Sequence, residues 1–439
     1  FVNAGMRFVT ELCKMRAFAE LWEEITRERY GVTDEKLRRF RYGVQVNSLG
    51  LTEQQPENNV YRILIEMLAV VLSKNARARA VQLPAWNEAL GLPRPFDQQW
   101  SLRMQQIMAY ETDLLEYGDI FDGNPEIARK VAELKEEAKA ELKKIEELGG
   151  AAAAVEIGYM KSKLVEANTA RLEAIEAGEQ TVVGVNKFTG GEPSPLASGE
   201  DQIMVVPEHV EAEQISRLKA WREGRDQRAA REAIEELARA AKEGRNMVEP
   251  SIIAAKAGVT TGEWGNVLRG VFGEYRAPTG VSSTARQVGG ALDAVRGEVE
   301  RVSQKLGKRA KFLVGKPGLD GHSNGAEQIA VRARDAGFDV IYAGIRSTPA
   351  ELVETAKKEG AHCIGLSILS GSHVTLAHEV IKLMKQEGVE APLVVGGIIP
   401  PADEKLLRDA GVAAVYTPKN YDLNAIMTDL AHIIEKTTV

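Results

Sequence analysis

A histidine lies in a glycine-rich loop in the last third of the chain, within the segment 316–325 (KPGLDGHSNG). Glycines stand on both sides of His322, and Asp320 precedes it by two residues. The glycines let the backbone leave a sheet edge and permit close approach by a large group. The imidazole can bind a metal ion while the carboxylate accepts the proton of its other ring nitrogen. Lys316 can in turn hold that carboxylate ionised.

Two other interpretations of this loop are a phosphate-binding loop and a surface turn with an incidental histidine. The loop has neither the spacing of a dinucleotide-binding fingerprint nor the Gly-Lys-Ser/Thr of a P-loop, so phosphate binding has no specific support. Small residues after three later apolar runs favour a larger site. They stand in the segments SILSG at 367–371, VGGI at 395–398 and YTP at 416–418.

Alternating strands and helices are expected to position these loops. Apolar runs predict strands at 310–314, 339–343, 363–369, 393–396 and 413–416. The predicted helices start near Gly325, Thr348, His373, Ala402 and Leu423. Five such repeats predict a flavodoxin-like doubly wound sheet, in which a ligand lies at the carboxyl ends of the strands.

The first half of the chain also alternates between strand-like and helix-like patterns of apolar residues. Strands are expected at 38–47 and 79–83, and helices at 5–29, 58–73 and 98–110. This alternation indicates βα units on a parallel sheet, as in α/β barrels and doubly wound folds.

The middle of the chain is predominantly helical in pattern. A solvated, charged helix is predicted at 125–147 and a short strand at 184–188, followed by a loop at 190–198. Further helical segments are expected at 211–244 and 250–257. A linker with few apolar anchors follows at 277–303, and a domain boundary is placed near Gly307.

Composition excludes several classes of protein. With 44% hydrophobic and 27% charged residues the chain is globular, and a net charge of -7 provides no basic surface for nucleic acid. No apolar run is long enough to span a membrane, so a cytoplasmic protein is expected. Cys13 and Cys363 indicate neither a disulfide framework nor a thiolate metal site. Because the chain begins at Phe1 inside a structured pattern, we interpret it as a fragment without its N-terminal part.

The terminal motifs resemble the cobalamin-binding domain of the base-off, His-on enzymes, with Asp-x-His-x-x-Gly, Ser-x-Leu and Gly-Gly in order. The resemblance implies that His322 is the lower axial ligand of cobalt and displaces the dimethylbenzimidazole tail. Asp320 and Lys316 would support it. Other implied cofactor-binding residues are Gly321, Ser323, Gly325, Ile329, Ser367, Leu369, Gly371, Gly396, Gly397, Tyr416 and Thr417.

The first half resembles the late strands of the (β/α)8 TIM barrel in the methylmalonyl-CoA mutase family, through QVNSLGLT at 45–52, EQQPENN at 53–59 and EALGLP at 88–93. The segments QLPAWN at 82–87 and YETDLLEYGD at 110–119 make it most similar to the ethylmalonyl-CoA mutases of that family. The resemblance covers essentially the whole chain.

This resemblance implies that Gln45 faces the substrate and adenosyl region and that Glu88 contacts the adenosyl ribose. Each could instead be a buried polar group that braces a barrel loop. Pro84 stands where the family has an asparagine, which puts the adenosyl contacts in doubt. The family's Tyr, Arg and His that grip the substrate lie upstream, so we assign no catalytic residue and expect the fragment alone to be inactive.

The fold expected is therefore α/β, with the C-terminal part of a TIM barrel and its helical extension at 1–188, a linker and helical region at 189–306, and a flavodoxin-like cobalamin-binding domain at 307–439. The implied activity is adenosylcobalamin-dependent isomerisation of an acyl-CoA, ethylmalonyl-CoA to methylsuccinyl-CoA, in a possible homodimer. Alternatives are a methylmalonyl-CoA mutase, a non-catalytic cobalamin carrier or sensor, and a plain flavodoxin-like interaction domain.

Overall fold

The computed structural model describes residues 1–192, 194, 203–204, 207–274, 292–420 and 422–438. The chain divides into two compact units, one of residues 1–204 with 278–439 and one of residues 205–277. Within the described residues, no helix is both long and apolar enough to cross a membrane.

The first sheet has three parallel strands in the order β1-β2-β3, with bounds β1 (Val2–Ala4), β2 (Gly43–Val46) and β3 (Ala80–Gln82). Helices α1 (Phe8–Glu28) and α2 (Asn58–Val71) connect them. Sequential order of parallel strands is the order of a (β/α)8 barrel, so the predicted βα units are confirmed. Val44 and Val46 are buried under these helices, whereas Gln45 points to the opposite, exposed face.

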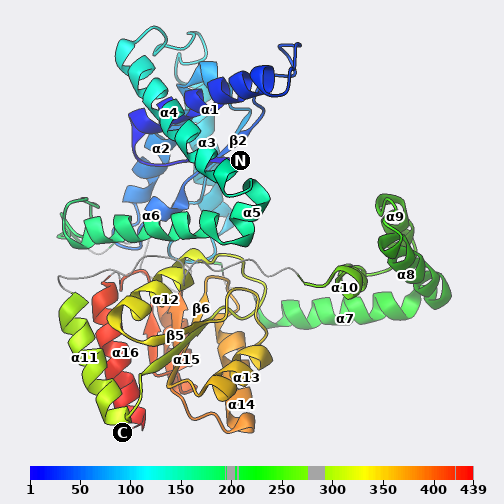
Figure 1. The fold of residues 1–439 in the computed structure, drawn as a ribbon, viewed down its shortest axis with the longest axis vertical. Coiled ribbons are helices and arrows are strands. Elements are labelled where there is room, and N and C mark those ends of the chain that lie inside the picture. The colour runs from blue at the N-terminus through cyan, green and yellow to red at the C-terminus, as the bar shows by residue number, and fades with distance from the viewer. Residues whose placement is uncertain (193, 195–202, 205–206, 275–291, 421, 439) are drawn as a thin grey trace. The chain divides into compact units, whose positions relative to one another are not determined.

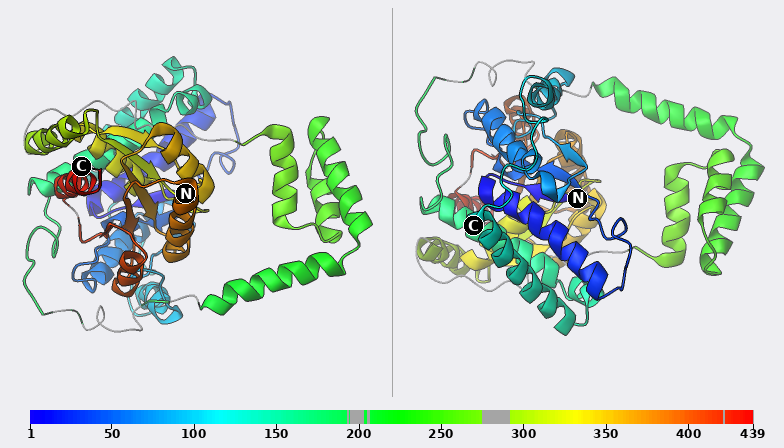
Figure 2. Two further views of the ribbon diagram at one scale, coloured as in Figure 1. Left: turned by 90° about the horizontal axis from the view of Figure 1, so that it is seen from below. Right: turned by 90° about the horizontal axis from the view of Figure 1, so that it is seen from above.

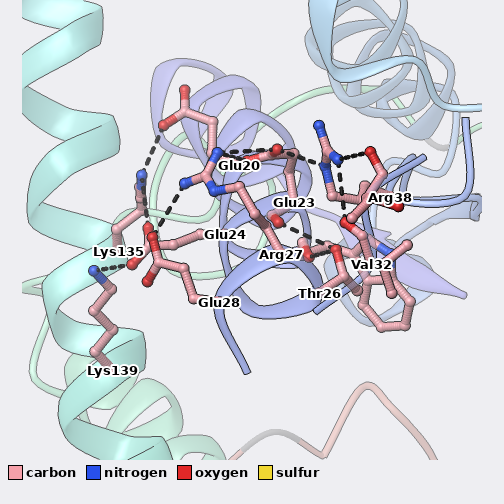
Figure 3. Close-up of polar contacts among 12 residues, drawn as sticks. Glu20, Glu23, Glu24, Thr26, Arg27, Glu28, Val32, Arg38, Lys135 and Lys139 are labelled. Atoms are coloured by element: carbon pink, nitrogen blue, oxygen red, sulfur yellow. Dashed lines mark hydrogen bonds and ion pairs between the residues drawn. The ribbon is translucent and has the colours of Figure 1, made fainter. Parts of the chain in front are cut away.

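Helix α3 (Pro95–Tyr110) follows β3, and α4 (Pro125–Glu147) packs along α1. The inner face of α4 buries Ile127 and Val131 against α1, so the helix predicted to be solvated is also anchored by apolar contacts. Its outer face carries ion pairs to α1, among them Lys135 Nζ with Glu20 Oε2 at 3.0 Å (Figure 3). These charges are partly exposed, with Lys135 at 21% and Glu20 at 52% of their side-chain surface.

Three helices were not anticipated from the sequence, α5 (Ala151–Glu156), the longer α6 (Tyr159–Glu176) and one of the second unit at Thr261–Phe272. The predicted strand at 184–188 is wrong, because the structure has only an isolated bridge between Val183 and Lys187 there. A tight turn closes this bridge, with the Gly184 amide donating to the Lys187 carbonyl oxygen at 2.8 Å. Most of the loop predicted at 190–198 lies outside the described residues.

The second unit contains α7 (Glu208–Gly224), α8 (Gln227–Lys242), α9 (Val248–Lys256) and α10 (Thr261–Phe272), of which α8 packs against α9 and α10 (Figure 2). The helical run predicted at 211–244 is interrupted. Asp226 caps α8, since its Oδ1 accepts from the amides of Arg228 at 2.9 Å and Ala229 at 3.0 Å. An aspartate at this position ends one helix and begins another.

The terminal domain is a parallel sheet which, in the residues that the structure describes, has five strands in the order β5-β4-β6-β7-β8. This is the flavodoxin-like order that the sequence predicts. The strands are β4 (Lys311–Gly315), β5 (Asp339–Tyr342), β6 (Cys363–Ile368), β7 (Leu393–Gly397) and β8 (Ala414–Tyr416). The helices are α12 (Asn324–Ala336), α13 (Pro349–Glu359), α14 (His373–Glu387), α15 (Pro401–Asp409) and α16 (Leu423–Thr438).

Helices cover both faces of this sheet, with α12 and α16 on one face and α13, α14 and α15 on the other (Figure 1). Helix α11 (Leu292–Leu306) joins the first of these layers by burying Val295, Val299 and Val302. The expectation of few apolar anchors at 277–303 is therefore wrong for its described part. Residues spaced three or four apart place these valines on one side of the helix. Cys13 and Cys363 are buried free thiols.

Candidate cobalamin-binding site

The loop that carries His322 leaves the sheet where β4 ends at Gly315 and returns where α12 begins at Asn324. Gly318 has a φ of 84°, a left-handed conformation that a glycine adopts without strain. The Gly318 amide donates to the Ser347 carbonyl oxygen at 3.0 Å, which ties the loop to the segment after β5. The loop is thus held at the carboxyl edge of the sheet.

Asp320 is the centre of a hydrogen-bond network beneath the histidine. Its side chain is 3% exposed and accepts four hydrogen bonds. Oδ1 accepts from the His322 amide at 2.9 Å and from His322 Nδ1 at 2.7 Å, while Oδ2 accepts from the Leu369 amide and from Lys316 Nζ, both at 3.0 Å. Burial raises the pKa of Asp320, but these hydrogen bonds outweigh burial and hold the pKa well below its usual value.

An ionised carboxylate only accepts hydrogen bonds, so Nδ1 of His322 must donate to Asp320. The lone pair of the imidazole then lies on Nε2, on a side chain that is 81% exposed. With Nδ1 bonded to the carboxylate, Nε2 is the ring nitrogen left free to bind a metal. The structure therefore brings together Lys316, Asp320 and His322 as the sequence predicts.

Lys316 is completely buried beside this carboxylate. Burial lowers its pKa, an effect that the charge and hydrogen bond of Asp320 oppose. The ammonium also donates to the Ser367 carbonyl oxygen at 2.8 Å and lies 3.4 Å from Ser367 Oγ. Lys316 therefore joins the ends of β4 and β6 as well as supporting Asp320.

A mostly apolar cavity of about 320 Å³ opens at the carboxyl ends of β6, β7 and β8. Eight of the predicted cofactor-binding residues line it, namely Gly325, Ile329, Ser367, Leu369, Gly396, Gly397, Tyr416 and Thr417. Gly321, Ser323 and Gly371 do not. A side chain at Gly321 would approach Arg346, and one at Gly371 would approach Leu92 of the barrel half.

The two glycines of β7 differ in what they require. At Gly397 the φ is 152°, and a Cβ would lie 1.8 Å from the Ile368 carbonyl oxygen. At Gly396 the nearest atoms to such a Cβ would be 3.7 Å away, which is ordinary contact. Gly397 is therefore needed by the backbone itself, whereas Gly396 keeps the floor of the cavity open. Glycine thus stands at these two positions for different physical reasons.

The residues present fit a corrin with its nucleotide base displaced. An imidazole nitrogen faces outward on a buried, charge-balanced support, and an apolar slot lies next to it. Adenosylcobalamin would be held by His322 through its metal and by the cavity through its tail. Imidazole is a common metal ligand, and its second nitrogen is bonded here to a carboxylate, as metal-binding histidines require.

The two barrel residues occupy different places. Gln45 stands in register with Asn3 and Gln82 on the exposed face of the first sheet, and it does not line the cavity. Burial raises the pKa of Glu88, while a hydrogen bond with Ser48 and the charge of His322 lower it. Glu88 therefore lies within electrostatic range of the imidazole.

Helix α6 contributes site residues that the sequence analysis missed. Lys161 Nζ lies 2.6 Å from Ser323 Oγ and 3.1 Å from Glu327 Oε1. Burial raises the pKa of Glu327, and Lys161 opposes that rise. Ser323 is therefore held by a lysine from the barrel half immediately beside His322. The irregular mixture of polar and apolar residues at 161–176 gives no signal for this contact.

The sequence matches two family models over most of its length. The model described as methylmalonyl-CoA mutase matches residues 1–274, and the model described as B12 binding domain matches residues 310–425. The second match contains the His322 loop and most of the strands that border the cavity.

Three bacterial proteins illustrate the similarity of the whole chain. The ethylmalonyl-CoA mutase of Cereibacter sphaeroides is 63% identical over 439 residues, which cover 100% of this chain and 67% of that protein. That of Methylorubrum extorquens is 64% identical over 437 residues, covering 99% and 63%. The methylmalonyl-CoA mutase of Cereibacter sphaeroides is 33% identical over 423 residues, covering 95% and 58%. The chain thus spans about two thirds of the length of the two ethylmalonyl-CoA mutases.

Proposed function

Because the chain belongs to the methylmalonyl-CoA mutase family, we propose that the protein is an adenosylcobalamin-dependent isomerase that rearranges the carbon skeleton of an acyl-CoA. The proposed reaction is ethylmalonyl-CoA to methylsuccinyl-CoA. Identity of 63–64% to two ethylmalonyl-CoA mutases, against 33% to a methylmalonyl-CoA mutase, supports this choice of substrate. The observation that carries the proposal is the outward imidazole of His322 on the buried Asp320 carboxylate.

In this proposal, His322 would hold the cobalt of the corrin, and Asp320, supported by Lys316, orients the imidazole by accepting the hydrogen bond of Nδ1. The cavity at the ends of β6, β7 and β8 takes the displaced base. The chemistry that adenosylcobalamin supplies when bound is radical chemistry. Gln45 and Glu88 are proposed to face the substrate and adenosyl groups from the barrel half. The catalytic residues that grip the substrate stay unassigned.

Three further predictions from the sequence form part of this proposal. They are the division at 1–188, 189–306 and 307–439, the homodimer and the cytoplasmic location. A methylmalonyl-CoA mutase is the alternative with the same mechanism. Assay of the full-length protein with both thioesters separates them, since a preference for methylmalonyl-CoA would contradict the proposed substrate. A non-catalytic cobalamin carrier or sensor would instead cause no scrambling of deuterium in a labelled acyl-CoA.

Electron paramagnetic resonance tests the ligand directly. The full-length protein, grown with nitrogen-15 histidine and loaded with cob(II)alamin, should show superhyperfine coupling to one imidazole nitrogen. His322→Ala should abolish that coupling. His378→Ala removes an exposed imidazole on α14 and serves as the matched control, which should keep it. Coupling that survives in His322→Ala would show that another nitrogen binds the metal and would overturn the proposed ligand.

A further inference from the structure

One side of the cavity is formed by the barrel half. Helix α6 contributes Asn168, Arg171 and Leu172 to the lining, and the loop after β2 contributes Leu49. The rest of the wall is largely apolar and comes from the terminal domain. Arg171 therefore places a permanent positive charge at the edge of an apolar cavity.

Arg171 has no anionic partner among the residues that the structure describes. To the other described residues it forms one hydrogen bond, from Nη2 to the Leu49 carbonyl oxygen at 3.4 Å, and no ion pair with a carboxylate. Burial lowers the pKa of this guanidinium, with no neighbouring acid to oppose that effect. Withdrawing a charged group from water is unfavourable unless it is paired.

Arg332, on helix α12, also lies where α6 meets the terminal domain, but its guanidinium has partners within the protein. Its Nη2 lies 3.4 Å from Glu176 Oε2, and its Nη1 donates to Asn424 Oδ1 at 2.9 Å. The guanidinium of Arg332 is thus balanced by protein groups, whereas that of Arg171 has unused donors. A bound anion would balance Arg171 as Glu176 balances Arg332.

Asn168 provides a second donor at the same edge. It precedes Arg171 by three residues, which places both on one face of α6. Within the described part of the chain, its side chain forms no hydrogen bond, and it lines the cavity with Arg171. A guanidinium and a carboxamide beside an apolar slot match a ligand that joins a planar apolar ring to an anion. Guanidinium groups bind phosphate oxygens in a two-pronged geometry.

We propose that Arg171, assisted by Asn168, binds the phosphodiester in the nucleotide tail of cobalamin. This inference rests on the proposed function, since it requires that the cavity holds the displaced base. The base and the phosphodiester are covalently linked, so a base within the cavity keeps the phosphodiester near its edge. The phosphates of the acyl-CoA share the same chemistry and are the competing source.

Two corrins test this assignment, because cobinamide has the corrin ring and cobalt but lacks the nucleotide tail. Affinities of the full-length protein for hydroxocobalamin and for cobinamide are measured by quenching of tryptophan fluorescence. Arg171→Met should weaken hydroxocobalamin binding on the order of tenfold to a hundredfold, as expected for a charge-assisted hydrogen bond, and leave cobinamide binding unchanged. Arg171→Lys should retain part of the affinity because it retains the charge.

Lys163→Met is the matched control on the same helix, since Lys163 is exposed and pairs with Glu166 at 2.7 Å. It should leave both affinities unchanged. Equal loss of both corrins in Arg171→Met would indicate a structural role and overturn the proposal. So would unchanged corrin affinities with weaker binding of the acyl-CoA, which would assign Arg171 to the substrate. If the unaltered protein binds neither corrin, the proposed function itself fails, which distinguishes the two failures.

Discussion

Two buried carboxyl groups, one near each sheet, have pKa values that are shifted in opposite directions. Asp320 beneath the His322 loop is 3% exposed, and its pKa lies well below the usual value. Glu66 on α2, beneath the loop after β2, is 1% exposed, and its pKa is raised to about 8. Burial acts in the same direction on both, since it disfavours the charged form. The difference must therefore come from their partners.

The partners differ in kind and number. Asp320 receives hydrogen bonds from a lysine, an imidazole and two backbone amides. Burial is the largest influence on Glu66, the charge of Glu11 adds to it, and Arg62 opposes them. In the described residues, Glu66 Oε2 has no hydrogen-bond partner. The terminal loop is thus stabilised by an ionised network, whereas the barrel loop rests on an acid that is largely neutral near pH 7.

Removing the cation from the first network should have the largest effect. Lys316→Met leaves the Asp320 carboxylate buried without its compensating charge, which costs about 3–5 kcal/mol of unfolding free energy. Urea unfolding monitored by circular dichroism measures it. Lys311→Met alters a partly exposed lysine at the start of β4, the strand that ends just before Lys316, and should cost about 1 kcal/mol or less. Similar losses in both variants would contradict the special role of Lys316.

The pH dependence of stability should distinguish the two carboxyl groups. The raised pKa of Glu66 means that its stabilising contribution is complete below about pH 4.5 and is lost as the pH rises to about 8. Asp320 behaves oppositely and contributes above its unfolded pKa of about 3.9. Between pH 5 and 8 we expect the titration of Glu66 to lower the free energy of unfolding by about 3–4 kcal/mol. Urea titrations should show this decline flattened in Glu66→Gln, and an unchanged decline would refute it.

The exposed charges between α1 and α4 should matter least. Lys135 pairs with Glu20 and Glu24 at the partly exposed edge of the contact between these helices (Figure 3), and ion pairs near the surface contribute about 0–1 kcal/mol. Lys135→Ala should lower the unfolding free energy by no more than that. The effect should disappear in 1 M NaCl, where screening acts within about 3 Å. A larger loss of unfolding free energy that persists in 1 M NaCl would contradict this prediction, because it would be the behaviour expected of the buried Lys316–Asp320 pair.

The sequence predicts the terminal domain well because its signals are local. Each strand is a short apolar run, and the Asp320–His322 pair lies within three residues, so its hydrogen bond follows from proximity. The role of Lys316 is similarly local. The cavity residues were found through small side chains at strand ends, which a parallel sheet gathers at one edge.

Contacts between distant segments could not be read in the same way. Lys161 and Ser323 are 162 residues apart, and Arg171 meets the loop at Leu49 across 122 residues. Nothing in a mixed-charge helix such as α6 identifies which face is covered. The missed break at Asp226 is different, because an aspartate before a helical run is a recognisable cap. The wrong strand at 184–188 reflects β-forming residues placed in a turn.

Helix α6 touches the loop after β2 through Arg171 and the start of α12 through Lys161. Its 18 residues form a rod about 27 Å long. A chimaera that grafts the terminal domain onto the barrel of another enzyme must therefore import α6 as well. Without α6, the grafted domain would keep its His322 loop but lose Lys161, which holds Ser323 beside it. The junction of such a chimaera should therefore lie before residue 159 rather than near Gly307.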